Sequence, residues 1–346
     1  MSTQRCVAAA ALNGAGLLLL ACGVFYPAAP GRAAAAELAG ELKTVPYRIV
    51  YESYRDKNWE LYQIDADGSH PVNLTRTPKL NELYPHVSPD GTKLSFCVDE
   101  GEGAAKARNV YVMNLDGTGR TLVARNSREP CWNPSGTGLV YLKGEFEKFT
   151  LTDFATRGIF TCDIAGGSRA EHPNPEIHHL YNICCTPDGK WFVATVHAGM
   201  GFSHAILAIG ADGKKVVNLK LPGCRPDVSA DGKKIAWGAD DFTLRVGDLD
   251  FSGPEPKVVN QRDAVKSKEP IETYHVDWSP DGKYLAFSRG PKKKSLGPAP
   301  EMVGAQAEGW NICVADAAAT NRVLALTTDG QSNKEPDWAP LPKSKP

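Results

Sequence analysis

The sequence predicts an all-β fold: a six-bladed β-propeller with four-stranded antiparallel blades, whose ring is closed by pairing of the N- and C-terminal strands. Three observations lead to this prediction. A short turn sequence recurs along the chain, alternating strands follow each copy, and each end of the chain carries only part of a repeat. The 346 residues include 33 glycines and 25 prolines, as a fold with many tight turns requires.

A tetrapeptide turn recurs once per repeat. Ser88-Pro89-Asp90-Gly91 is one copy, related copies begin at 133, 186, 229 and 279, and a degenerate sixth begins at Trp338. Proline presets φ for a type I turn, and glycine takes the left-handed position that follows. The residues just before the turns are Val87, Trp132, Cys185, Val228, Trp278 and Trp338. Their separations of 45, 53, 43, 50 and 60 residues match the length of a four-stranded blade.

An alternating apolar strand follows each complete turn. Its two large apolar columns begin with Leu94 and Phe96 in the first copy and recur as Leu285 and Phe287 in the fifth. A period of two with large residues on one face is typical of a packed strand. A further strand and an Asp-Gly type turn follow in the repeat, as at 61–68.

The two ends of the chain carry complementary parts of one blade. The strand at 49–51 fits the alternating columns but has no preceding turn, whereas 335–338 fits an innermost strand that no second strand follows. Pairing the ends would remove two exposed sheet edges. We therefore expect the ring to be closed by these two strands.

Two segments carry a resemblance to a known family. The sequence WSPDGKYLAF at 278–287 and ELYQIDADG at 60–68 resemble the TolB-like (WD40-type) propeller repeat. The resemblance covers about residues 46–340, which we expect to form the propeller, with a tail at 341–346. It implies the fold and is unspecific about function, since such repeats occur in proteins of many activities.

The N-terminal region reads as an export signal. Residues 1–22 combine the positive charge of Arg5 with an Ala/Leu-rich stretch. The sequence ending in Cys22 resembles a bacterial lipobox, in which Cys22 would be the site of lipid attachment; cleavage in the alanine run 33–36 or an uncleaved anchor are the alternatives. Residues 23–45 are interpreted as an Ala/Pro-rich linker. We expect a periplasmic protein, a membrane-anchored lipoprotein or a secreted protein.

The composition restricts the partners. A formal net charge of −1 argues against nucleic acid, whose binding depends on clustered basic residues. Seven cysteines lie outside the export signal, an odd number. Cys131 and Cys184 occupy the same repeat column, and we expect free thiols there because a bridge requires Cα atoms within about 7 Å.

No catalytic motif is present. The sequence has no G-x-S-x-G elbow, P-loop, HExxH or dinucleotide fingerprint, so we expect no cofactor. The favoured function is a non-enzymatic binding scaffold of the bacterial envelope or periplasm. We expect it to recognise a protein segment or a glycan at the channel mouth and on the face with long, varied loops.

The candidate binding residues are the six that stand three positions before the inner-strand anchors. They are Tyr84, Glu129, Asn182, Arg225, His275 and Glu335. Being repeat-equivalent, they should form one ring around the channel mouth, with Arg225 able to bind a carboxylate. The alternative is that the ring ties the inner strands together through hydrogen bonds.

A histidine group supports a second hypothesis. His178, His179, His197 and His204 belong to loops expected on the same face. Gathered imidazoles can bind a transition metal, so the alternative function is a metal-assisted glycan lyase or hydrolase.

Overall fold

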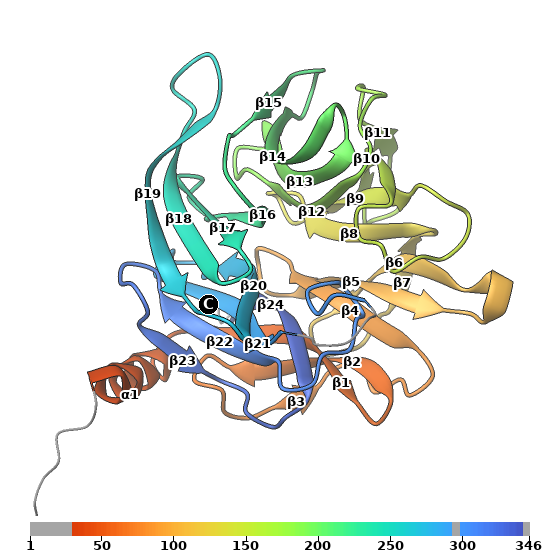
Figure 1. Ribbon diagram of the computed structural model, residues 1–346. Coiled ribbons are helices and arrows are strands. Elements are labelled where there is room, and N and C mark those ends of the chain that lie inside the picture. The colour runs from red at the N-terminus through yellow and green to blue at the C-terminus, as the bar shows by residue number, and fades with distance from the viewer. Residues whose placement is uncertain (1–29, 293–297, 342–346) are drawn as a thin grey trace, which may run out of the picture.

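Six four-stranded antiparallel sheets form a ring around a central axis (Figure 1). The computed structural model describes residues 30–292 and 298–341. The export signal at 1–22, including Cys22, and residues 342–346 of the tail lie outside these ranges. The predicted six-bladed propeller is confirmed.

The blades are numbered here by the order of their inner strands. Blade 1 contains β4 (Asn81–Val87), β5 (Lys93–Glu100), β6 (Ala107–Asn114) and β7 (Thr121–Ala124). Blade 2 contains β8 (Ser127–Trp132), β9 (Gly138–Gly144), β10 (Thr156–Asp163) and β11 (Arg169–Glu171). Blade 3 contains β12 (Leu180–Cys185), β13 (Trp191–Gly199), β14 (Phe202–Gly210) and β15 (Val216–Asn218).

The remaining blades follow the same pattern until the ring closes. Blade 4 contains β16 (Cys224–Val228), β17 (Lys234–Asp240), β18 (Thr243–Asp250) and β19 (Lys257–Lys266). Blade 5 contains β20 (Ile271–Trp278), β21 (Tyr284–Pro291), β22 (Asn311–Asp316) and β23 (Val323–Ala325). Blade 6 contains β24 (Ser332–Pro340), β1 (Tyr47–Arg55), β2 (Asn58–Asp65) and β3 (Val72–Asn73).

Blade 6 joins the two ends of the chain. Strand β24 pairs antiparallel with β1, so that Trp338 lies opposite Ile49 and Asp337 opposite Val50. Eight of the nine β24 residues, Ser332 to Ala339, are buried. Ring closure by the terminal strands is therefore confirmed.

The core lies within and between the blades, on the predicted apolar columns. The side chains of Phe96, Trp237 and Phe287 are fully buried. The tetrapeptide turns are closed by hydrogen bonds such as that from Gly91 N to Ser88 O, at 2.8 Å. Gly91 has φ +71°, and a Cβ there would lie 2.0 Å from the carbonyl oxygen of Pro340, so only glycine fits.

One helix departs from the expected linker at 23–45. Helix α1 (Pro30–Leu42) packs on the propeller through Leu38 and Leu42, which are 0% and 1% exposed. Glu41 Oε1 of the same helix accepts from Arg322 at 2.6 Å. The alanine-rich sequence favours a helix, and the spacing of four residues places both leucines on one face. Within the described ranges, no helix has the length and apolar character needed to cross a membrane.

Candidate functional site

The six candidate residues share one unusual backbone conformation. Each has a positive φ, between 49° for Asn182 and Glu335 and 57° for His275. The strand register shifts around this position in every blade. Positive φ is uncommon outside glycine, so its sixfold recurrence marks a β-bulge built into each inner strand.

Side chains of the preceding blade hold several of these bulges. The amide of Asn182 donates to Glu129 Oε2 at 2.9 Å, and that of Tyr84 donates to Glu52 Oε2 at 3.0 Å. The amide of Arg225 donates to Thr195 Oγ1, also at 2.9 Å. Of these three acceptors only Glu129 belongs to the ring, so its bond to Asn182 is the one that joins two inner strands, β8 and β12, through ring residues.

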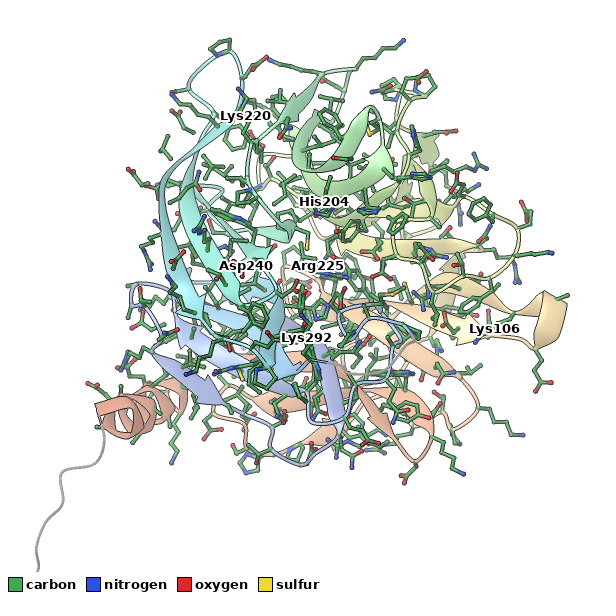
Figure 2. The ribbon with its side chains drawn as sticks, viewed as in Figure 1. Lys106, His204, Lys220, Arg225, Asp240 and Lys292 are labelled. Carbon is green, nitrogen blue, oxygen red and sulfur yellow. The ribbon has the colours of Figure 1, made fainter. Side chains whose placement is uncertain are left out.

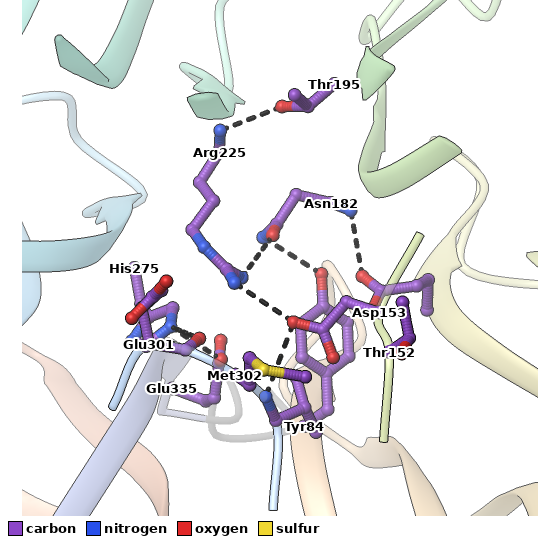
Figure 3. A network of polar contacts seen from close by, with 12 residues as sticks. Tyr84, Thr152, Asp153, Asn182, Thr195, Arg225, His275, Glu301, Met302 and Glu335 are labelled. Carbon is purple, nitrogen blue, oxygen red and sulfur yellow. Dashed lines mark hydrogen bonds and ion pairs between the residues drawn. The ribbon is translucent and has the colours of Figure 1, made fainter. Parts of the chain in front are cut away.

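Figure 3 shows the side chains of five of the six residues gathered near the axis: Tyr84, Asn182, Arg225, His275 and Glu335. Asn182 Nδ2 donates to the Tyr84 hydroxyl at 3.2 Å, and Arg225 donates to Asn182 Oδ1 at 2.7 Å. His275 Nε2 lies 2.9 Å from Glu335 Oε1. The structure therefore brings the predicted ring together as a polar network.

A segment of the β21–β22 connection covers this ring. We call residues 299–305 the plug. The carbonyl oxygen of Glu301 accepts from His275 Nε2 at 2.7 Å, and that of Met302 accepts from Lys334 Nζ at 2.7 Å. Val303 is fully buried. The plug therefore covers His275 and Lys334 on this face, whereas Arg225 also lines a pocket beside the plug.

Arg225 already has an anionic partner within the chain. Its guanidinium donates to Asp153 Oδ2 at 3.0 Å, and its centre lies 5.3 Å from the Tyr181 ring. Arg225 is 4% exposed. The expected open carboxylate anchor is therefore replaced by a buried ion pair, formed by a residue of the β9–β10 loop that no repeat pattern indicates.

Burial shifts the titration of this network. It raises the pKa values of the Glu129 and Glu335 carboxyl groups. Burial, reinforced by Arg225 and Lys334, lowers the pKa of His275 well below its usual range despite the nearby Glu335. The environment favours neutral forms of all three groups.

The four candidate metal-binding histidines form separate contacts. His179 Nε2 lies 3.0 Å from Glu145 Oε2, and its Nδ1 lies 2.8 Å from the Ala198 carbonyl oxygen. His178 Nδ1 is 2.7 Å from the Glu176 carbonyl oxygen. His197 and His204 face each other, with 3.1 Å between their Nδ1 atoms. In the part of the chain that the structure describes, no three His, Cys, Asp or Glu side chains converge on a metal position.

Cys131 and Cys184, which occupy the same column of the repeat, have different neighbours around their sulfur atoms. Cys131 Sγ lies 3.8 Å from Cys185 Sγ, whereas Cys184 Sγ donates to the carbonyl oxygens of Val193 and Pro226 at 3.6 and 3.8 Å. The seven described cysteines are free thiols.

A pocket of about 360 Å³ opens beside the ring. Residues of blades 3, 4 and 5, the β9–β10 loop and the plug line it; they include Asp153, Phe154, Tyr181, Asp240, Asp241, Tyr274 and Glu301. Figure 2 shows Arg225, His204 and Asp240 on this face. Arg225, His197 and His204 of this lining were predicted as candidates from the sequence. The acidic residues were not, because they come from hairpins and loops outside the repeat columns.

Comparison with known proteins agrees with the architecture. A TolB homolog from Chlorobaculum tepidum is 32% identical over 105 residues, which span 30% of this chain and 23% of the homolog. The structure of TolB from Acinetobacter baumannii aligns with 85% of this chain over 67% of the TolB chain, with a TM-score of 0.57 and 18% identity. The chain has a TolB-like propeller fold. No family model matches it.

The propeller as a whole also resembles one from outside the TolB group. A chain of a nidogen–laminin complex covers 86% of this chain and 99% of its own, with a TM-score of 0.55 and 10% identity. At these identities the structural likenesses show the fold alone.

Proposed function

We propose that this TolB-like propeller is a non-enzymatic scaffold that binds a protein segment on its loop face. The loop face is the side bearing the plug and the pocket; the turn face bears the tetrapeptide turns. The observation that carries the proposal is the contrast between them. Short, uniform turns occupy one face, whereas long segments, such as the plug and the loop containing Asp153, converge at the axis on the other.

Rigidity of the ring supports the proposal. The bulges, the buried ion pair and the closed blades hold the loop face in one arrangement, which reduces the ordering cost of binding. The crystallised nidogen–laminin complex shows that a protein of similar fold occurs in a protein complex. We further propose that the protein is exported, on the strength of the signal-like residues 1–22; lipid attachment at Cys22 is one of the processing routes.

A photo-crosslinking amino acid placed on each face tests the proposal. The positions are His204, exposed on the loop face, and Lys190, exposed on the turn face. In envelope extract, position 204 should crosslink a protein and position 190 should not. Equal labelling from both positions, or labelling from position 190 alone, would contradict the proposal. Capture of a glycan at position 204 would show that the partner is a glycan and not a protein.

The metal-assisted lyase or hydrolase remains a second proposal with weaker support, because each of the four histidines already contacts an atom of the chain. Metal analysis of the purified protein tests it. Stoichiometric manganese, zinc or iron, lost in the double variant His179→Ala/His204→Ala, would favour the enzyme.

A further inference from the structure

The pocket beside the ring is strongly acidic; we call it the acidic pocket. Its carboxylates are Asp153, Asp240, Asp241 and Glu301, and its only lining guanidinium or ammonium group among the described residues is that of Arg225. Arg225 is itself neutralised by Asp153. Three carboxylates from two separate parts of the chain, the β17–β18 hairpin and the plug, are left without a lining cation.

One buried oxygen in this pocket lacks a partner. Asp153 is 4% exposed, and its Oδ2 accepts from Arg225 and from Val303 N. Its Oδ1 is buried and has no hydrogen-bond partner among the described residues. An unpaired buried carboxylate oxygen is costly, and Asp153 lines the pocket, so a donor that reached this oxygen from the pocket would be stabilised.

The negative charge continues behind the pocket wall. Glu272 is 4% exposed, and its Oε2 likewise has no partner in the described ranges. Burial, with Asp241 and Glu301 adding repulsion against the opposing effect of Lys292, raises the pKa of Glu272 to about 7. A cation in the pocket would relieve this repulsion.

The other walls of the pocket are aromatic. Phe154, Tyr181 and Tyr274 line it, and the Tyr274 hydroxyl donates to Asp241 Oδ1. Aromatic faces accept aliphatic chains and attract cations. The carboxylates are too dispersed to form a metal cluster among the described residues, which favours an elongated organic cation over a metal ion.

We propose that the acidic pocket binds an ammonium or guanidinium group carried on a short aliphatic chain, as in a lysine or arginine side chain of the bound protein segment. This inference rests on the proposed function, to which it adds the chemistry of the partner. The pocket of about 360 Å³ is within the size range of small-ligand sites. A free diamine shares the same chemistry and is distinguished below.

Calorimetric titration with three probes tests the inference. The probes are acetyl-Ala-Lys-Ala-amide, its norleucine equivalent, which lacks the charge, and cadaverine. The lysine peptide should bind at least about tenfold more tightly than the norleucine peptide, since hydrogen bonds to charged groups are strong. Tighter binding of the lysine peptide than of cadaverine identifies a protein side chain as the ligand, and the reverse identifies a free amine.

The double variant Asp240→Asn/Glu301→Gln removes two charges while keeping the side-chain shapes. It should weaken lysine-peptide binding about tenfold or more. Glu102→Gln, at an exposed site in the 100–106 loop, is the matched control and should bind like the unmodified protein. Equal binding of the lysine and norleucine peptides, or unchanged binding by the double variant, would overturn the inference. If crosslinking at position 204 still captured a protein, the proposed function would stand without it.

Discussion

The guanidinium of Arg225 and the carboxylate of Asp153 are joined at 3.0 Å, and each side chain is only 4% exposed. Removing one partner leaves the other charge buried and unpaired, at a cost of about 3–5 kcal/mol. We therefore expect Asp153→Ala to lower the free energy of unfolding by about that amount, measured by urea denaturation. Asp263→Ala, which breaks the more exposed pair with Arg245, should cost about 1 kcal/mol. Equal losses in the two variants would contradict this account.

The pairing of β24 with β1 predicts that ring closure is essential. Deleting residues 333–346 removes nearly all of β24 (Ser332–Pro340), exposing the edge of β1 and the apolar surface around Tyr51. Exposed edges and apolar patches promote aggregation. The truncated protein should aggregate or unfold, as judged by size-exclusion chromatography and thermal melting. Deleting only 342–346 leaves β24 intact and serves as the control; a monomeric, equally stable 333–346 deletion would show that closure is dispensable.

The architecture could be predicted because its signals are local. The turn chemistry seen at Gly91 and the alternation seen around Phe96 recur in five of the six blades, and counting from the turns located the ring that includes Asn182 and Arg225. The docking of α1 was missed because its alanine-rich sequence also suits a flexible linker. The contact between Asp153 and Val303 spans 150 residues and lies outside the repeat, so no periodicity indicates it.

The positive φ of the ring residues was also beyond prediction, because none of the six is glycine. Asn182 has φ 49°, a conformation that glycine adopts freely and a β-branched residue adopts at a cost of about 1–2 kcal/mol. At position 182, Gly should therefore be at least as stable as Ala, and Val should be less stable. All three variants lose the side-chain bonds to Tyr84 and Arg225, so their differences report the backbone.

Position 183 provides the control for this series. Ile183 is buried and its φ is not positive, so Ile183→Gly should be far more destabilising than Ile183→Val, which typically costs about 0.5–1.5 kcal/mol. Thermal melts of the five variants test whether Gly is more stable than Val at position 182 and Val more stable than Gly at position 183. If Val were the most stable of the three residues at position 182, the inner-strand bulge would not be present there.

The buried carboxyl group of Glu129 predicts a dependence of stability on pH. Its pKa is raised by burial and by repulsion from Asp153, so the folded state holds this proton at pH values where the unfolded state has lost it. The contribution of Glu129 to the free energy of unfolding is then fully present below its ordinary pKa, near 4.5, and is lost as the pH rises through its raised pKa in the folded state. His275 acts in the opposite direction: its lowered pKa removes stability as the pH falls below about 6.5.

Comparing Glu129→Gln with the unmodified protein separates the two contributions, because only the Glu129 titration is removed. Glutamine imitates the protonated carboxyl group and can still accept from the Asn182 amide. The stability of the unmodified protein relative to the variant should therefore fall by about 1–3 kcal/mol between pH 4.5 and 8, measured by urea denaturation at each pH. Glu102→Gln should follow the unmodified protein throughout. Parallel curves for Glu129→Gln and the unmodified protein would mean that Glu129 is ionised in the folded ring at neutral pH, held by Arg225 and the Asn182 amide rather than by a proton.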